Sequence, residues 1–131
     1  MIQHRPHLLP KIRSDGIMSA AAGAPCTLRI ASFVPGRRCA GHETTVGCHL
    51  PIWGKGKGTK VTDMGVAFGC SACHAIIDGV DQEALRYLEK KFGAAMMTRM
   101  LHGLTETHAL LIDDGVIVIP DAACVSSPLH N

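Results

Sequence analysis

The chain has 131 residues, of which 47% are hydrophobic but only 4% aromatic, and its formal net charge is +2. This length predicts a single domain with a modest core, and the scarcity of aromatic side chains leaves that core in need of additional cross-links. The small net charge does not by itself indicate a nucleic-acid partner, and no apolar segment approaches the roughly 18 residues of a membrane span.

The N-terminal residues 1–16 are basic and interrupted by proline, and they lack the apolar run of a secretory signal. We therefore expect a flexible lead-in and a cytoplasmic protein without membrane association, in which paired cysteines more often hold metal than form disulfides. The start stays open between Met1 and Met18, because nothing upstream of Met18 carries identifiable chemistry. A short helix is expected over residues 17–24.

Two segments that follow have the composition of strands. Residues 26–33, CTLRIASF, alternate and are rich in strand-forming residues, and the turn-rich loop 34–43 follows them. Residues 43–50, ETTVGCHL, are the strongest strand candidate in the chain, and Pro51 ends it.

The middle of the chain predicts a loop, a strand and a short helix. Residues 54–60 form a glycine–lysine loop, and residues 61–68 predict a second short strand that Gly65 interrupts. The segment CSACHAIID, residues 70–78, is typical of a short helix closed by Gly79.

The C-terminal part has a helical pattern from residue 81 to about residue 111, which Gly93 and Gly103 are expected to divide or bend. GVIVIP, residues 115–120, favours an isolated edge strand or a docked tail, and the last ten residues are expected to be disordered. The predicted division of the chain is a lead-in at 1–16, a domain at 17–115 with its core at 26–79 and a helical extension at 81–112, and a tail at 116–131.

Four of the six cysteines form two pairs. Cys26 and Cys39 flank a loop, and Cys70 and Cys73 form a C-x-x-C motif. Two pairs that meet at one point make the tetrahedral thiolate site typical of structural zinc. Such a site would compensate for the small core, so we favour zinc over the alternative of ordinary buried cysteines. The other two cysteines do not fit this pairing and are expected to be isolated small hydrophobic residues.

Two histidines have positions that suit catalysis. His49 ends the strongest strand candidate, directly before Leu-Pro and the glycine-rich loop. His74 follows the C-x-x-C motif, and Asp78 lies four residues later, on the same helical face. A histidine and an aspartate in this arrangement can bind one divalent ion together. Alternatively, Asp78 belongs only to the Asp-Gly turn that ends the helix.

A hairpin histidine that faces a metal-holding helix is the arrangement of ββα-metal, or HNH-type, nucleases. There the strand histidine is a general base that activates water, and the helix-held cation binds the scissile phosphate. Lys55, Lys57 and Lys60 on the intervening loop would contact the phosphate backbone, although a merely solvated loop is the alternative.

The segments PCTLRI, ETTVGCHLP and TDMGVAFGCSACHAIIDG resemble the YbcO-type family of small phage and prophage nucleases, which is assigned to the HNH group. The resemblance covers about residues 21–79, with a looser helical match to about residue 115. It implies a role in phage DNA processing or recombination. One departure is Cys48, which stands where many HNH nucleases have an Asp or His ligand of the metal ion.

The resemblance also implies roles for individual residues. It makes His49 the strand histidine and puts Asp63 on an acidic position ahead of the second strand, where it would orient the base or bind metal. His102 has a weak counterpart in the C-terminal helix. The remaining matches are Cys26, Cys39, Cys70 and Cys73 on the cysteine positions of the family, His74 on the C-x-x-C-H histidine and Asp78 on the Asp-Gly aspartate.

We therefore predict an α+β fold, a small zinc-stapled ββα-metal domain with additional C-terminal helices. The predicted activity is metal-dependent hydrolysis of DNA, with His49 and Asp63 as catalytic residues. His74 would bind a catalytic Mg²⁺, Mn²⁺ or Zn²⁺, and Asp78 or Asp63 would be its second ligand. DNA is the expected partner, with a homodimer or a recombination protein as further candidates.

Other functions remain open or are disfavoured. A non-catalytic zinc module that binds DNA or protein would use the same cysteines and leave both histidines idle. Haem attachment through CSACH would require export, for which no signal is visible. A thioredoxin-like redox role would require a surrounding βαβ pattern that the sequence lacks.

Overall fold

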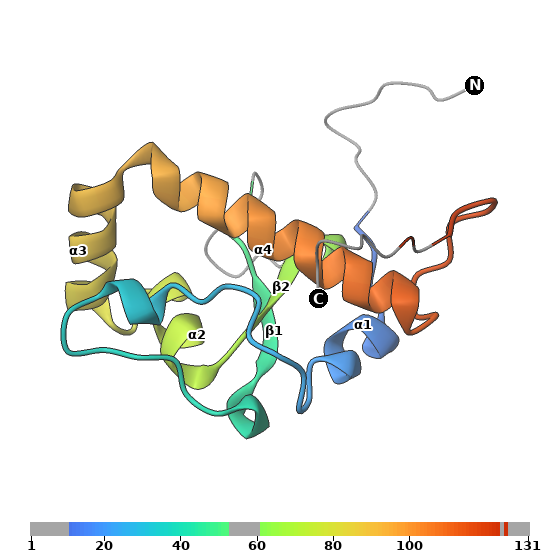
Figure 1. The fold of residues 1–131 in the computed structure, drawn as a ribbon, viewed down its shortest axis with the longest axis horizontal. Helices are drawn as coiled ribbons and strands as arrows, with labels where there is room; N and C mark the ends of the chain where they lie inside the picture. Colours follow the sequence, from blue (N-terminus) through green and yellow to red (C-terminus); the bar gives the residue numbers. More distant parts are fainter. Residues whose placement is uncertain (1–10, 53–60, 124, 126–131) are drawn as a thin grey trace.

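The computed structural model of the protein describes residues 11–52, 61–123 and 125. Its helices and strands form a mixed α and β structure, which agrees with the expected α+β class (Figure 1). The elements, with 3-10 helices written η, are α1 (Asp15–Ala20), η2 (Ala31–Phe33), η3 (His42–Thr44), β1 (Val46–His49), η4 (Asp63–Gly65), β2 (Val66–Gly69), α2 (Ser71–Ile77), α3 (Gln82–Phe92) and α4 (Ala94–Asp113).

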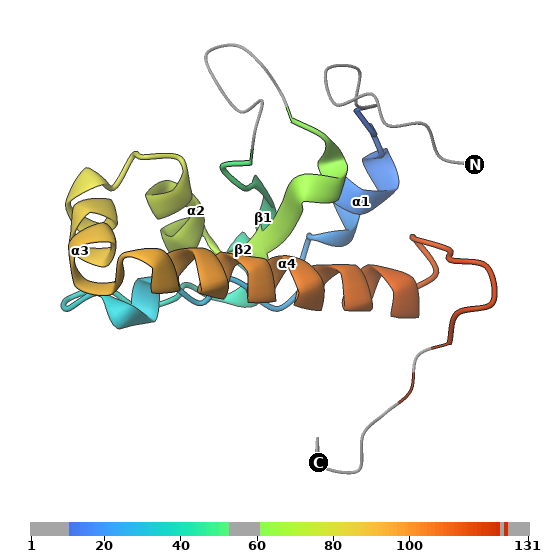
Figure 2. The same cartoon turned by 90° about the horizontal axis from the view of Figure 1, so that it is seen from above.

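The centre of the fold is an antiparallel hairpin of β1 and β2, in which His49 pairs with Val66 and Cys48 with Ala67. Because side chains alternate along a strand, Cys48 and Ala67 face one side of the hairpin, and Val66 and Phe68 face the other. α2 and α1 lie on opposite sides of the hairpin, and the long helix α4 crosses the hairpin from the α2 side to the α1 side (Figure 2).

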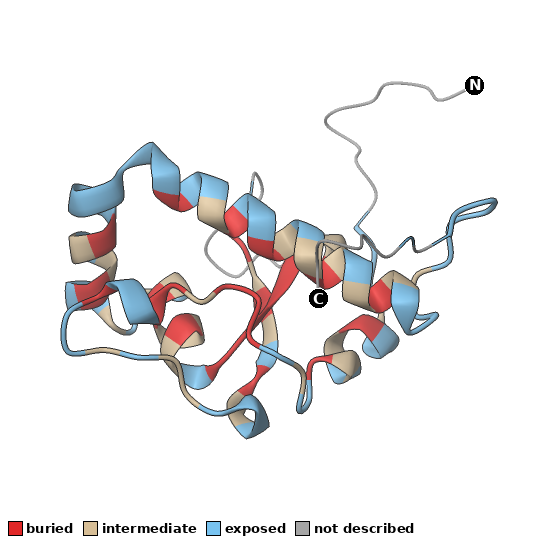
Figure 3. Ribbon diagram, viewed as in Figure 1, coloured by how far each residue is buried: buried red, intermediate tan, exposed pale blue. Residues whose placement is uncertain are grey.

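The alternation of side chains along the hairpin strands divides the buried hydrophobic residues into two clusters. The larger cluster lies on the α2 side of the hairpin, and the smaller cluster lies between α1, β2 and α4 (Figure 3). The larger cluster includes Leu28, Ile30, Cys48, Ile76, Leu88 and Met100, and the smaller cluster consists of Ile17, Ala21, Val66, Phe68 and Leu111.

Local sequence explains where the helices begin and end. The Ser14 side chain caps α1 by accepting a hydrogen bond from the Ile17 N–H, and Asp81 caps α3 in the same way through the Ala84 N–H. Gly79, with φ of 75°, follows α2 as predicted. Gly93, with φ of 53°, divides α3 from α4, which confirms the predicted break there.

Gly103 does not divide α4, because the helix is continuous from Ala94 to Asp113. The residue is buried, and a Cβ atom there would lie 3.1 Å from the Thr27 carbonyl oxygen. Gly103 therefore allows the helix to approach the Thr27 backbone closely.

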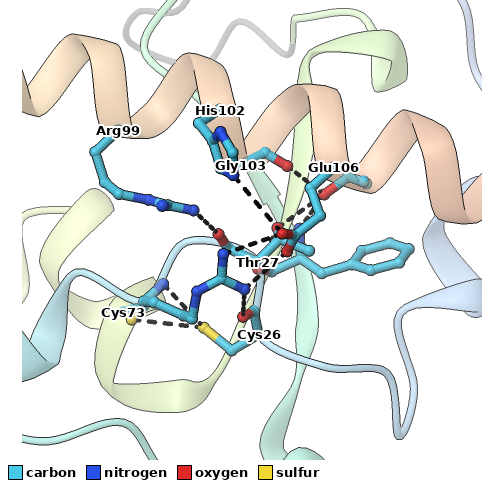
Figure 4. A network of polar contacts seen from close by, with 10 residues as sticks. Cys26, Thr27, Cys73, Arg99, His102, Gly103 and Glu106 are labelled. Atoms are coloured by element: carbon cyan, nitrogen blue, oxygen red, sulfur yellow. Dashed lines mark hydrogen bonds and ion pairs between the residues drawn. The ribbon is translucent and has the colours of Figure 1, made fainter. Parts of the chain in front are cut away.

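Polar side chains attach α4 to the segment that begins at Cys26 (Figure 4). Arg29 makes a bidentate ion pair with Glu106, with N···O distances of 2.8 and 3.0 Å. Arg99 donates a hydrogen bond of 2.6 Å to the Thr27 carbonyl oxygen. Thr27 and Thr107 are fully buried, and their hydroxyl oxygens lie 2.8 Å apart.

The predicted strand over residues 26–33 is wrong, because this segment has no strand and ends in the 3-10 helix η2. The N–H groups of Thr27 and Leu28 both donate to the Phe68 carbonyl oxygen, at 2.8 and 3.2 Å, so no regular ladder forms. Arg29 then has φ of 50°, which turns the chain back so that its N–H reaches Cys26 Sγ.

Residues 115–120 also form no strand, and the alternative of a docked tail agrees better with the structure. The N–H groups of Val116 and Ile117 both bond back to the Leu111 carbonyl oxygen, and Ile117 packs against the smaller cluster. Within the described residues, no helix combines the length and apolar character that a membrane crossing requires.

Candidate metal centre and candidate active site

The four paired cysteines meet at one point, as their spacing predicts. The Sγ atoms of Cys26, Cys39, Cys70 and Cys73 all lie within 4.8 Å of one another. The distances from Cys73 Sγ to the Cys26 and Cys39 sulfurs are both 3.7 Å. Tetrahedral zinc with Zn–S bonds of about 2.3 Å separates neighbouring sulfurs by about 3.8 Å, whereas a disulfide requires about 2.05 Å. The geometry therefore fits one zinc ion and not a pair of disulfides.

Backbone amides around the cluster suit thiolate ligands. Because an N–H donor favours the charged form of a sulfur atom, such contacts help to hold metal-binding cysteines deprotonated. The turn at Arg29 and the start of η2 supply two of these donors. The three contacts are Arg29 N to Cys26 Sγ at 3.4 Å, Ala31 N to Cys73 Sγ at 3.4 Å and Ala40 N to Cys70 Sγ at 3.3 Å.

The thiols are also strongly coupled to one another. The hydrogen bond with Cys73 lowers the pKa of Cys26 to about 4, and the same contact, followed by burial, raises the pKa of Cys73. Burial raises the pKa of Cys39. One thiolate thus suppresses ionisation of its neighbours, and a divalent cation would relieve this repulsion. The donor set therefore suits zinc, which takes four thiolates.

The second feature is a histidine–aspartate pair at the end of the hairpin. His49 Nε2 lies 2.9 Å from Asp63 Oδ1, and the Asp63 side chain is only 7% exposed. The Ser14 N–H donates to Asp63 Oδ2 at 2.7 Å, and Arg13 Nη1 lies 3.8 Å from Asp63 Oδ1. Burial by itself would raise the pKa of Asp63, but the Ser14 N–H, the His49 ring and Arg13 outweigh it and lower this pKa below its usual value.

The state of Asp63 determines which nitrogen of His49 can act as a base. An ionised carboxylate only accepts hydrogen bonds, so Nε2 of the neutral imidazole ring is the protonated nitrogen that donates to Asp63. Nδ1 then carries the lone pair that can take up a proton.

The third feature is a second histidine–aspartate pair on α2. His74 Nε2 and Asp78 Oδ2 lie 2.8 Å apart, and the two side chains are 39% and 41% exposed. Asp78 also ends the helix, because it is the C-cap residue and its N–H bonds back to the His74 carbonyl oxygen. Asp78 therefore belongs to the Asp-Gly turn, and its carboxylate also contacts the histidine.

The two histidine–aspartate pairs do not merge into one cluster of ligands. Among the described residues, only the four cysteines bring three or more potential metal ligands together. His49 lies on the α1 side of the hairpin with its cross-strand neighbour Val66, whereas Cys48 is fully buried in the larger cluster beside α2. Cys48 is not part of the four-cysteine group and is buried among the hydrophobic residues of the larger cluster.

The remaining residues of interest are Arg13, Ser14, two histidines of α4 and three lysines. Arg13 and Ser14, which the sequence places in a flexible lead-in, contact Asp63, and the only local signal is the Ser-Asp pair typical of a helix N-terminus. His108 Nε2 lies 2.8 Å from the Met64 carbonyl oxygen in η4. His102 is exposed and lies 3.8 Å from Glu106. The predicted phosphate contacts, Lys55, Lys57 and Lys60, lie outside the described residues.

Comparison with known proteins identifies relatives that share most of this chain. The family model described as "Putative nuclease YbcO" matches residues 15–109. Proteins of that name from Escherichia coli strain K12 and from Enterobacteria phage 82 are each 30% identical over 102 residues, which cover 77% of this chain and 95% of the relative. No solved structure matches the chain significantly.

Proposed function

Because this chain belongs to the YbcO family, whose members carry the description of putative nucleases, we propose that it is a metal-dependent DNA endonuclease. The observation that carries the proposal is the contact of 2.9 Å between His49 and the buried Asp63. A histidine whose ring is held by an ionised carboxylate can act as a general base. Since one relative comes from a phage, we extend the proposal to phage or prophage DNA processing in the cytoplasm.

In the proposed reaction, His49 acts on the water that attacks the phosphodiester. The water oxygen forms a bond to phosphorus and its proton passes to His49 Nδ1. The bond from phosphorus to the leaving sugar oxygen breaks, and that oxygen takes a proton from solvent. Asp63 does not touch the substrate. It holds the ring in one orientation and stabilises the imidazolium that forms, as the carboxylate does in other histidine-based sites.

The proposed ligands of the catalytic ion are His74 and Asp78, which together offer a ring nitrogen and a carboxylate on the half-exposed face of α2. A divalent ion held there would supply positive charge for the phosphate. α2 and the hairpin stand on the same side of α4 (Figure 2). Because His49 lies on the α1 side of the hairpin and His74 lies on α2, the proposal requires a DNA substrate long enough to contact both histidine–aspartate pairs. Lys55, Lys57 and Lys60 belong to the proposal as contacts to the DNA backbone.

A second candidate function is a zinc-stabilised module that binds DNA or protein without cleaving it. The observation in its favour is that, in the described part of the chain, ligands gather in a group of three or more only at the four cysteines. This alternative leaves His49 and His74 without a chemical role.

The test is nicking of supercoiled plasmid with added magnesium or manganese. We expect cleavage by the wild type and a loss of about 10²- to 10⁴-fold with His49→Ala, because the general base is removed. His102→Ala is the matched control, since His102 is exposed on α4, and it should retain activity. His74→Ala should raise the metal concentration that half-maximal cleavage requires. Each variant must first be shown to be folded and to retain its zinc.

Two results would contradict the proposal. Equal cleavage by wild type and His49→Ala would mean that the activity is a contaminant or that His49 is not the base. No cleavage of plasmid, single-stranded or branched DNA with any ion would leave the zinc module as the better interpretation.

A further inference from the structure

We propose that the segment Ile12–Ser14 is part of the catalytic site and that Arg13 is a positioning residue that acts through Asp63 on His49. This inference rests on the proposed nuclease function. The segment lies upstream of residues 15–109, which the family model matches, so the family resemblance does not assign it.

The segment is attached to the chain ahead of η4 by backbone contacts on both sides of Arg13. The Ile12 N–H donates to the Thr62 hydroxyl at 3.0 Å, and the Asp63 N–H donates to the Ile12 carbonyl oxygen at 2.8 Å. The Ser14 N–H donates to Asp63 Oδ2 at 2.7 Å. These three bonds hold Asp63, the residue that contacts His49. They come from a segment about 50 positions earlier in the chain.

Arg13 places a positive charge beside Asp63 and also bonds to the backbone ahead of it. Its guanidinium group lies 3.8 Å from Asp63 Oδ1, the same oxygen that contacts His49, and it donates a hydrogen bond to the Val61 carbonyl oxygen. The Arg13 side chain is 45% exposed, whereas that of Asp63 is 7% exposed. A half-exposed cation therefore partly balances a buried carboxylate and connects it to the backbone two residues earlier.

The consequence concerns the orientation of the general base. With Ser14 N–H on Oδ2 and with His49 and Arg13 at Oδ1, the carboxylate has one arrangement that satisfies all its neighbours. Without the Arg13 guanidinium, the negative charge of the Asp63 carboxylate is less well balanced. The carboxylate then fixes the orientation of the His49 ring less firmly. A positioning role predicts a lower kcat, because small errors in orientation reduce the rate of the chemical step. A direct phosphate contact by Arg13 would instead raise KM.

The experiment compares full-length wild type with Arg13→Met, Arg13→Lys and the control Arg86→Met. Arg86 is exposed on α3 and bonds to Gln82, so Arg86→Met makes the same change in charge away from the site. In plasmid nicking we expect Arg13→Met to lower kcat about 10-fold or more with KM unchanged, and Arg13→Lys to recover most of the loss. Arg86→Met should match wild type, and the thermal midpoints should agree.

A spectroscopic measurement tests the inference independently of activity. We expect the ring nitrogen resonances of His49 to shift in Arg13→Met and to stay in place in Arg86→Met. Unchanged His49 resonances, or a raised KM with intact kcat, would overturn the positioning role. If the wild type cleaves no DNA, the proposed function fails, and the His49 resonances alone decide whether Arg13 positions the histidine–aspartate pair.

Discussion

At the level of single residues, Thr107 holds together three segments of the fold. Its hydroxyl donates to the Gly103 carbonyl oxygen at 2.8 Å, accepts from the Phe68 N–H at 3.1 Å and lies 2.8 Å from the Thr27 hydroxyl. The side chain is fully buried. A buried hydroxyl with three partners cannot be removed without leaving other polar groups unsatisfied.

We therefore expect Thr107→Val, which keeps the shape of the side chain, to lower the free energy of unfolding by about 1–3 kcal/mol. The matched control is Thr105→Val, because Thr105 is exposed on the same helix and its hydroxyl bonds only within α4. It should change the free energy of unfolding by less than about 0.5 kcal/mol. Urea unfolding followed by circular dichroism measures both, and equal effects would contradict a special role for Thr107.

Residue-level prediction succeeded where a motif specified the geometry. The C-x-x-C pair and the two earlier cysteines were predicted to meet, and their sulfurs do meet. The contact between His49 and Asp63 crosses a segment of 14 residues, so spacing alone did not reveal it. Arg13 and Ser14 were missed because a short polar segment has no hydrophobic periodicity. Their role depends on contact with Asp63, which is distant in the sequence.

At the level of secondary-structure elements, α4 packs closely against the Thr27 backbone through Gly103. The Thr27 backbone cannot easily move away, since its N–H and its hydroxyl both bond to the Phe68 carbonyl oxygen. A larger residue at position 103 would therefore separate α4 from this segment and from β2.

We expect Gly103→Val to lower the free energy of unfolding by about 1–3 kcal/mol, because it overfills a tight contact. Ala109→Val, at an exposed position of the same helix, reports the cost of a β-branched residue alone, which is below about 1 kcal/mol. Thermal unfolding of the two variants compares the effects. A Gly103→Val protein as stable as the Ala109→Val protein would show that the helix contact can adjust.

Helices were easier to predict than strands in this chain. The buried residues of α4 recur at helical spacing, and a side-chain cap or a glycine with positive φ marks the ends of α1, α2 and α3. Residues 26–33 have the composition of a strand, but the bonds of Thr27 and Leu28 to one carbonyl oxygen and the turn at Arg29 prevent a ladder. Composition does not reveal such tertiary contacts.

At the level of the whole molecule, the cysteine cluster connects the loops that carry Cys26 and Cys39 to the start of α2. A structural zinc ion there would contribute directly to folding. We expect a strong chelator to remove one zinc per chain and to lower the thermal midpoint or abolish cooperative unfolding. Because the pKa values of Cys73 and Cys39 are raised, protons compete with zinc, and the metal should be retained less well as the pH falls.

A matched pair of cysteine variants makes this prediction specific. Cys39→Ala should lose the zinc, whereas Cys48→Ala removes a buried thiol outside the four-cysteine group and should retain one zinc per chain. Metal analysis of the purified proteins gives the number of zinc ions per chain. Loss of zinc from both variants, or from neither, would contradict the assignment of the four ligands.

The contact between His108 and the carbonyl oxygen of Met64 has a consequence for how the protein is made. His108 lies 44 residues after Met64, and Thr107 lies 80 residues after its partner Thr27. During synthesis, η4 and the hairpin leave the ribosome well before the part of α4 that holds them in place. A chain still being translated therefore lacks the support that fixes Asp63 and His49. The hairpin and η4 are therefore fully supported only after this part of α4 has been synthesised.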